Sequence, residues 1–414
     1  MPLSIYLQTS ARSGELWFEE VTPTVVQFLQ LFGTQKPDRM QMQGLQQASV
    51  ELKLRVATFC NAHSRAAPQL SAFAKLIRDL RDDEAFLLLK APPETSAAEM
   101  AYGVALAKLN GETTLQQVYD MDATFGTMLS DYDVHNLRTD RHILIGNKER
   151  DNRACRFCHR TTADKAKFSN VAHAISAALG NRYLKLADEC DCCNEFFGKE
   201  IEPHLIALLD FPRVLLGIEA RGGRPEIPIQ GGRMYHDGEK VIIEIFVDEA
   251  EGHAKILEIH ADGNLNIIPE RVYRAFAKIA LSVIEEPQLA QLRDTVEWVR
   301  HGRRPEGRRL PVVHTAIVPL PPNPSAQITL YVRRSERSQL PHVVGEFRLG
   351  CYLYAFVLPF SKHDENDGVF IGDTPFMDVF RHYAAVRPWR PLDLDDADAT
   401  SPSKLRFVEG AELP

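Results

Sequence analysis

The stretch CRFCHRTTADKAKFSNVAHAISAALGNRYLKLADECDCCNEFFGKEIEPHL, residues 155–205, holds five of the seven cysteines of this 414-residue chain. Two C-x-x-C pairs, Cys155/Cys158 and Cys190/Cys193, each predict a chelating turn. The 31 residues between them (159–189) are enough for the two turns to converge on one ion. Four thiolates in a closed tetrahedral site are typical of structural zinc. The spacing therefore predicts one structural zinc ion.

The C-D-C-C run leaves a choice of register. Cys190 and Cys192 would also form a chelating pair, but Cys190/Cys193 repeats the spacing of the first pair. We therefore interpret Cys192 as a spare thiol. Buried reduced cysteines or a redox C-x-x-C are the alternative interpretation, although a redox motif accounts for only one of the two pairs.

The residues around the two pairs predict a strand, a turn, a strand and a helix. Lys167–Ile175 is typical of a short strand, and Leu179-Gly180-Asn181 is typical of a turn. This order places His173 on a strand and Asn194 at the start of a helix. The apolar residues after the second pair recur every four positions, as on one face of a helix: Phe197, Ile201 and Leu205.

Together these residues resemble the ββα-metal core of the HNH endonucleases. The match is closest to a zinc-bearing branch whose members share an A-H-x-I-x-x-x-L-G-N run before E-C-x-x-C-N. In this chain the two runs are Ala172–Asn181 and Glu189–Asn194. The resemblance covers residues 155–205 and is silent on the rest of the chain. It implies a treble-clef-like zinc core and in-line hydrolysis of phosphodiester bonds in DNA.

The resemblance also implies roles for three residues. It makes His173 the general base that takes a proton from water, a role that suits an imidazole because its pKa lies near working pH. Asn194 falls where the family has a ligand of the catalytic cation. Asn181 resembles the asparagine that holds the loop bearing the base. A satisfied core histidine and an ordinary helix N-cap are the alternative interpretations of His173 and Asn194.

The chain departs from the family directly before the base. Many HNH enzymes have an acidic metal ligand at that position, where this chain has Ala172. A second protein ligand of the catalytic ion must then come from elsewhere, and the following helix offers three candidates: Glu202, Glu195 and His204. Their spacing does not distinguish them, and we assign the role to Glu202 as a working prediction. An oxygen-rich site with open positions fits Mg²⁺ or Mn²⁺ better than zinc.

The amino-acid composition limits the ways in which the chain can bind DNA. The formal net charge of −8 disfavours free, non-specific duplex binding, which depends on phosphate neutralisation. DNA contact is therefore expected to be local or supplied by a partner. The basic residues nearest the core are predicted to bind backbone phosphate beside the active site, and a solvated charged loop is the alternative interpretation: Arg150, Arg153, Arg156, Arg160 and Lys167.

No apolar run approaches the roughly 18 residues of a membrane span, and the first residues lack the pattern of a signal peptide. Cysteines held on zinc also favour a reducing compartment. The expected location is the cytoplasm, without membrane contact.

The fold class expected is α+β, in four segments. Residues 1–145 are predicted as a mixed, mainly helical domain and 146–212 as the HNH core. Residues 213–392 are predicted as an α+β domain and 393–414 as a disordered acidic tail. The clearest local signals are a helix start at Thr22-Pro23, a hairpin at Asp237-Gly238 and a helix after Pro269. The basic run His301–Arg309 is expected to be solvated.

Two functions from different classes fit these features. The first is a metal-dependent DNA endonuclease, the effector or a subunit of a bacterial defence system of the restriction, abortive-infection or RNA-guided kind. By analogy alone, protein or guide-RNA subunits would be its partners. The second is a zinc-stapled nucleic-acid-binding or scaffold protein whose HNH core is inactive, which Ala172 makes plausible.

Overall fold

The computed structural model describes most of the chain: residues 3–10, 13–35, 40–63, 69–93, 96–112, 115–137, 139, 142–149, 153–220, 222–229, 232–245, 258–318, 325–364, 370–386, 388–398 and 401–408. It divides into two compact units, Met1–Ala123 and Thr124–Pro414. Both combine helices and sheets, so the chain is α+β as predicted. None of the helices described is long and apolar enough to cross a membrane.

The first unit is built on an antiparallel sheet of order β2-β1-β6-β5. Its strands are β1 (Leu3–Gln8), β2 (Ser13–Phe18), β5 (Leu45–Gln47) and β6 (Ala85–Leu89), and a separate ladder joins β3 (Gly33–Gln35) to β4 (Met40–Met42). Its helices are α1 (Pro23–Gln30), α2 (Val50–His63), α3 (Gln69–Arg78) and α4 (Ser96–Leu109). This sheet makes the unit more evenly mixed than the mainly helical domain predicted.

Local signals in the first unit are confirmed. Thr22 caps α1, because its hydroxyl accepts a hydrogen bond from the Val25 amide at 3.4 Å. Pro23 occupies the first helical position, where its missing amide proton costs nothing. Phe28 packs edge-on against Phe32 and Phe73 in the core of this unit, which none of the predicted site residues enters.

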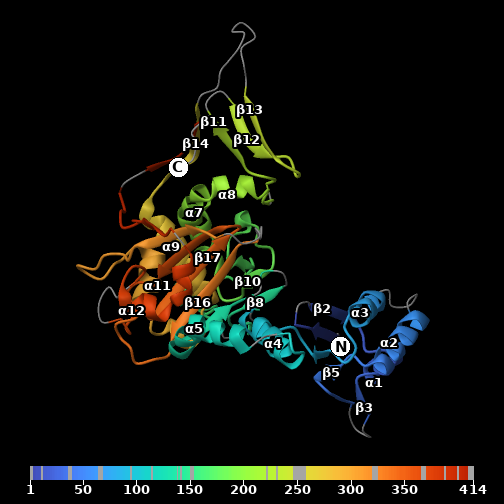
Figure 1. Cartoon of the computed structure of the whole chain (residues 1–414). Helices are drawn as coiled ribbons and strands as arrows, with labels where there is room; N and C mark the ends of the chain where they lie inside the picture. The colour runs from blue at the N-terminus through green and yellow to red at the C-terminus, as the bar shows by residue number, and fades with distance from the viewer. Residues whose placement is uncertain are drawn as a thin grey trace. The chain divides into compact units, whose positions relative to one another are not determined.

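The second unit contains a six-stranded antiparallel sheet of order β19-β15-β18-β17-β16-β7 (Figure 1). Its strands are β7 (Tyr132–Asn136), β15 (Val313–Ile317), β16 (Gln327–Arg333), β17 (Val343–Leu349), β18 (Tyr352–Val357) and β19 (Arg390–Leu392). Neighbouring residues such as Val343 and Val344 enter two different cores, because successive side chains of a strand point to opposite faces. Both faces of the sheet are therefore covered.

Helix α9 (Pro269–Val283) covers the face of this sheet that adjoins the cysteine segment. Phe276 stacks on Phe356 with ring centroids 5.4 Å apart and also packs against Phe347. The predicted helix after Pro269 is thus confirmed, and it is buried almost all round. Two shorter helices follow it, α10 (Glu286–Leu289) and α11 (Arg293–His301). On the other face lie α12 (Thr374–Val379) and the 3₁₀ helix η3 (Arg381–Ala385).

The cysteine segment forms a small sheet followed by helices. The sheet has the order β8-β10-β9, with β8 (Ile143–Ile145), β9 (Ala172–His173) and β10 (Leu184–Leu186), and β9 runs antiparallel to β10. After it come α6 (Asp191–Phe196), one π-helical turn η2 (Phe197–Ile201), α7 (Glu202–Leu208) and α8 (Asp210–Leu215). The strand predicted over Lys167–Ile175 is only two residues long.

A five-stranded sheet completes the second unit, in the order β13-β12-β11-β14-β20. The predicted Asp237-Gly238 turn joins β12 (Gly232–His236) to β13 (Val241–Ile245), and β11 (Glu226–Ile229) lies beside β12. The last strand, β20 (Ser401–Val408), pairs with β14 (Glu258–Ile267), so the prediction of disorder is wrong for these tail residues. Backbone pairing with a distant strand offsets the polar composition that suggested disorder.

The compact units do not follow the predicted domain boundaries. The first ends at Ala123 rather than 145, because α5 (Leu115–Asp131) leads into β7, which pairs with β16. Residues 146–212 and 213–392 share one unit, since Leu205 and Phe276 belong to the same hydrophobic core. The cysteine segment is therefore packed into a larger domain.

Candidate metal centre and active-site cavity

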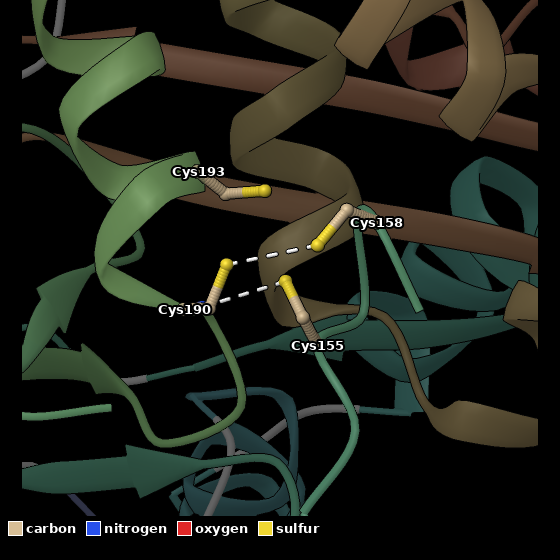
Figure 2. Close-up of side chains that lie close together, drawn as sticks. All are labelled: Cys155, Cys158, Cys190 and Cys193. Carbon is tan, nitrogen blue, oxygen red and sulfur yellow. Dashed lines mark hydrogen bonds between the residues drawn. The ribbon is translucent and has the colours of Figure 1, made fainter. Parts of the chain in front are cut away.

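The four predicted zinc cysteines come together. The sulfur atoms of Cys155, Cys158, Cys190 and Cys193 all lie within 4.8 Å of one another. Figure 2 shows them pointing toward a common centre, two from the start of α6 and two from the facing turn. This separation suits four ligands of one tetrahedral ion, since Zn–S bonds are about 2.3 Å long. The donor set thus fits a metal ion, as the spacing predicted.

Backbone geometry holds the cluster. His159 has a left-handed backbone (φ 58°), and its amide donates to the Cys155 carbonyl at 2.8 Å, which closes the first chelating turn. Cys190 is the N-cap residue of α6, and its amide donates to the Cys155 sulfur at 3.4 Å. Cys192 is exposed and lies outside the cluster, so the register Cys190/Cys193 is the one found.

Contacts among the thiols favour a thiolate at one of them. Hydrogen bonding to Cys190 raises the pKa of Cys155 to about 12, and hydrogen bonding to Cys155 lowers the pKa of Cys190. The Cys158 and Cys190 sulfurs are 3.6 Å apart. A metal ion bound here would displace the remaining protons, because thiolates are the ligands of such ions.

An arginine from a remote helix contacts the cluster. Arg300 of α11 donates to the Cys193 sulfur at 3.3 Å, and its guanidinium lies 4.1 Å from the centroid of the Phe196 ring. Four thiolates around a divalent ion carry two net negative charges, which a nearby guanidinium stabilises. Sequence reasoning missed Arg300, because 107 residues separate it from Cys193.

A cavity of about 380 Å³ lies beside the two short strands. His173 projects from β9, and Lys185 is its cross-strand neighbour on β10. Polar side chains dominate the lining, which includes Asn170, His173, Ser176, Lys185, Asn194 and Glu202. The predicted base and two predicted ligands of the catalytic ion therefore line one cavity, and its oxygen and nitrogen donors fit a hard divalent cation with open positions.

Asn194 is not a helix cap. Cys190 caps α6, and Asn194 lies inside the helix, where its amide donates to the Cys190 carbonyl at 3.0 Å. Its half-buried side chain faces the cavity. The cap interpretation of Asn194 is therefore wrong, and an asparagine inside a helix does not gain the stability that a cap would give.

Asn181 ties together the loop between β9 and β10. Its buried side-chain amide donates to the carbonyls of Ile175 (2.7 Å) and Leu184 (2.9 Å), and its oxygen accepts from the Leu184 amide at 2.9 Å. Gly180 precedes it in a left-handed conformation (φ 82°) that turns the chain into β10. Asn181 thus holds the segment that follows His173 and does not line the cavity described.

A buried lysine lies behind the cavity. Lys278 of α9 is 1% exposed, and its ammonium donates to the His173 carbonyl at 2.9 Å and to Glu202 Oε1 at 3.1 Å. Glu189, also 1% exposed, forms an ion pair with it at 3.5 Å. Sequence reasoning gave no role to Lys278 or Glu189, and no local signal marked the lysine.

Burial and neighbouring charges have opposite effects on the pKa values of Lys278 and Glu189. Burial lowers the pKa of Lys278, but attraction to Glu189 and Glu202 outweighs burial and leaves that pKa above its usual value. Burial raises the pKa of Glu189 to about 7, and the Lys278 ammonium opposes the rise. Lys278 is therefore a charged residue at neutral pH, held by its two carboxylate partners.

Comparisons with known proteins identify no relative of this chain. No family model, curated protein or solved structure matches this chain. The resemblance to HNH endonucleases therefore stays a prediction, supported by motif and geometry alone.

The other candidate ligands of the catalytic ion lie elsewhere. Glu195 forms an exposed ion pair with Lys199 at 2.6 Å. His204 is buried, and its Nδ1 accepts from the Ile268 amide at 3.2 Å. Ala172 is fully buried and offers no donor. Of the three candidates on the following helix, Glu202 is the one that lines the cavity with His173.

The basic residues predicted to meet DNA divide into two groups. Arg156 is buried: its guanidinium forms two 3.1 Å hydrogen bonds with Asp188 and donates to the carbonyl of Leu281, near the end of α9, at 2.7 Å. The phosphate role predicted for Arg156 is therefore wrong, because its donors are used inside the protein. It instead ties the cysteine turn to α9.

The remaining basic residues are more accessible. Arg160 and Lys167 are exposed, and Arg153 is half-buried with its guanidinium 5.5 Å from the centroid of the Phe168 ring. Arg150 lies outside the described residues. Within the basic run after α11, Arg304 pairs with Glu270 at 2.9 Å, so that run is only partly solvated.

Proposed function

We propose that the chain is a metal-dependent DNA endonuclease with an HNH-type ββα-metal core. The observation that carries the proposal is that His173, Asn194 and Glu202 line one cavity beside the four-cysteine cluster. His173 lies on β9, Asn194 on α6 and Glu202 at the start of α7. In the chain β9, β10 and α6 follow one another as strand, strand and helix, the order that the resemblance implies. Zinc at the cysteines would be structural, since all four ligand positions are protein thiolates.

In this proposal His173 removes the proton of the attacking water. It lies on a strand whose backbone is fixed by pairing with β10 and by the hydrogen bond from Lys278 to its own carbonyl. Asn194 and Glu202 would hold Mg²⁺ or Mn²⁺, which when bound stabilises the charge of the leaving oxygen. Lys185, which sequence reasoning missed, lines the same cavity and supplies a cation for the scissile phosphate.

Exposed basic side chains on the segment that leads to β9 suit a local contact with DNA. They are Arg160 and Lys167, between the first cysteine pair and β9. With a net charge of −8, the rest of the chain offers DNA no general attraction, so a partner subunit of a defence complex would direct it to its target. Electrostatics thus favour a nuclease that acts within an assembly.

The experiment is cleavage of supercoiled plasmid by zinc-loaded protein over a range of Mg²⁺ and Mn²⁺ concentrations. We expect nicked and linear DNA with either ion. We also expect loss of cleavage when a mild chelator removes the added ion while zinc analysis still finds one zinc per chain. Intact plasmid at every ion concentration, together with DNA retention in a gel-shift assay, would instead support the zinc-stapled binding protein that Ala172 suggests.

A further inference from the structure

The residue that the proposed nuclease reaction does not explain is Lys278. It is buried in the middle of α9, yet its ammonium contacts three segments of the candidate site. It donates hydrogen bonds to the His173 carbonyl on β9 at 2.9 Å and to Glu202 at the start of α7 at 3.1 Å, and it forms an ion pair with Glu189, before α6, at 3.5 Å. Two of the three donor protons of the ammonium are therefore used by segments of the candidate site.

Such an arrangement needs a reason, because taking an ammonium out of water carries a large free-energy cost. A buried apolar residue would pack against Phe197, whose ring centroid lies 5.7 Å from the ammonium, without that cost. What an apolar side chain cannot do is fix the position of a carboxylate. Lys278 bonds to Oε1 of Glu202, whose side chain is 20% exposed, and leaves its Oε2 for a second partner.

The placement of the two carboxylates points the same way. Glu189 is enclosed, whereas Glu202 reaches the cavity wall beside Asn194. The carboxylate that Lys278 holds by a hydrogen bond is therefore the one at the cavity, where a divalent cation would be held.

We propose that Lys278 is a positioning residue, which fixes Glu202 as a cation ligand and the His173 strand as the support of the base. This inference rests on the proposed nuclease function. Lys278 touches neither DNA nor the reacting atoms, so it acts only through Glu202 and His173. Groups of this kind behind a metal ligand typically change metal affinity or activity by about 10- to 100-fold when they are removed.

The test separates positioning from simple stabilisation. Lys278→Met alone leaves the buried Glu189 and the half-buried Glu202 without their shared cation and is expected to lower the melting temperature. The informative protein is the double variant Lys278→Met/Glu189→Gln, which replaces one basic and one acidic side chain and so keeps the formal net charge. A matched control is Glu270→Gln/Arg304→Gln, which removes another ion pair of α9 (2.9 Å) without a change in net charge.

Two sets of quantities are measured at one fixed pH. They are the Mn²⁺ dissociation constant, from the concentration of free ion seen by electron paramagnetic resonance, and the kcat and KM of plasmid cleavage. In the charge-matched double variant we expect a melting temperature above that of Lys278→Met. We also expect Mn²⁺ binding and kcat both weaker by about 10-fold or more, with KM for DNA unchanged. The control variant should keep wild-type Mn²⁺ affinity and kcat.

A double variant that melts like wild type and binds Mn²⁺ like wild type would overturn the proposal, because Lys278 would then only stabilise the fold. A double variant that no longer melts cooperatively would overturn it as well, since the fold rather than Glu202 would depend on the lysine. Failure of the nuclease function looks different. Wild-type protein would then bind Mn²⁺ at Glu202, as Glu202→Gln would reveal, without cutting DNA.

Discussion

The cysteine cluster and the adjacent cavity lie on the same short segment, but they are built in opposite ways. All four cysteines come from residues 155–193 and meet at distances that suit one ion. The cavity takes His173, Asn194 and Glu202 from three elements. It also depends on Lys278, which is 105 residues from the strand that it supports.

This difference separates a site that holds the fold together from a site that can do chemistry. Three of the four cysteines are buried, and the ligands are all alike, so the cluster can bind a metal with no position left for a substrate. The cavity is polar and partly open, with the buried Lys278 and Glu189 behind its wall. Losing a cluster ligand should therefore damage the fold, whereas losing a cavity ligand should damage only the reaction.

The largest effect is expected at the cluster. Cys158→Ser removes one of four thiolates, and structural zinc contributes on the order of 10 kcal/mol to a small module. The variant should lose its zinc and become sensitive to proteases within residues 155–205. Elemental analysis and limited proteolysis measure both effects.

Cys192→Ser is the matched control for this prediction, because Cys192 is exposed next to the cluster. It should retain one zinc per chain and the wild-type protease pattern. Loss of zinc from Cys192→Ser, or its retention in Cys158→Ser, would show that the ligand set is wrong.

A smaller loss of stability is expected at Arg156. Its side chain is 4% exposed and bridges Asp188 to the end of α9, so Arg156→Leu leaves a buried carboxylate unpaired. Removing one partner of a buried pair costs about 3–5 kcal/mol, or roughly 10 °C in melting temperature for a domain of this size. Calorimetry of Arg156→Leu beside Arg160→Leu, which changes an exposed arginine, measures the difference. A stable Arg156→Leu with weakened DNA binding would restore the phosphate role.

A still smaller change is expected at Asn194. Asn194→Ala removes an oxygen donor from the cavity wall and leaves the backbone of α6 intact. We expect the Mg²⁺ concentration for half-maximal cleavage to rise about tenfold, equivalent to about 1.4 kcal/mol, with little change in melting temperature. An unchanged Mg²⁺ dependence in a cleavage titration would remove Asn194 from the ligand set.

The smallest effect is expected at Lys185, which contacts phosphate in the proposed function. Lys185→Ala should raise KM for DNA several-fold and change kcat less, because one phosphate contact contributes on the order of 1 kcal/mol or below. Steady-state cleavage kinetics measure both constants. A fall in kcat at constant KM would place Lys185 in the chemical step instead.

The sequence could predict features that depend on neighbouring residues, but not those that depend on residues far apart in the chain. The C-x-x-C turns, the Thr22 cap and the Asp237-Gly238 hairpin are set by neighbouring residues, and all three are found in the structure. The pairing of β20 with β14 and the extent of the second unit depend on residues far apart in the chain. No local sequence pattern indicates such pairings.

The basic residues illustrate the same limit within the site. Arg156 and Arg160 look alike in sequence, yet one is buried against Asp188 and the other is exposed. The positions of Asp188 and of α9 in the fold account for the difference. Lys278 likewise looks like any other lysine of a helix in the sequence. Its role becomes visible only in the fold, which brings Glu189 and Glu202 next to it.

The central claim is that chemistry at the cavity is separable from the fold that the cluster stabilises. The most direct measurement compares His173→Ala with His301→Ala, an exposed histidine at the end of α11, for plasmid cleavage, DNA binding, zinc content and melting temperature. We predict that His173→Ala cuts about 10²–10⁴-fold more slowly, the usual contribution of a general base, while its other three properties match those of His301→Ala and wild type. A His173→Ala protein that melts several degrees lower and still cuts DNA would contradict the claim, because His173 would then be a structural histidine.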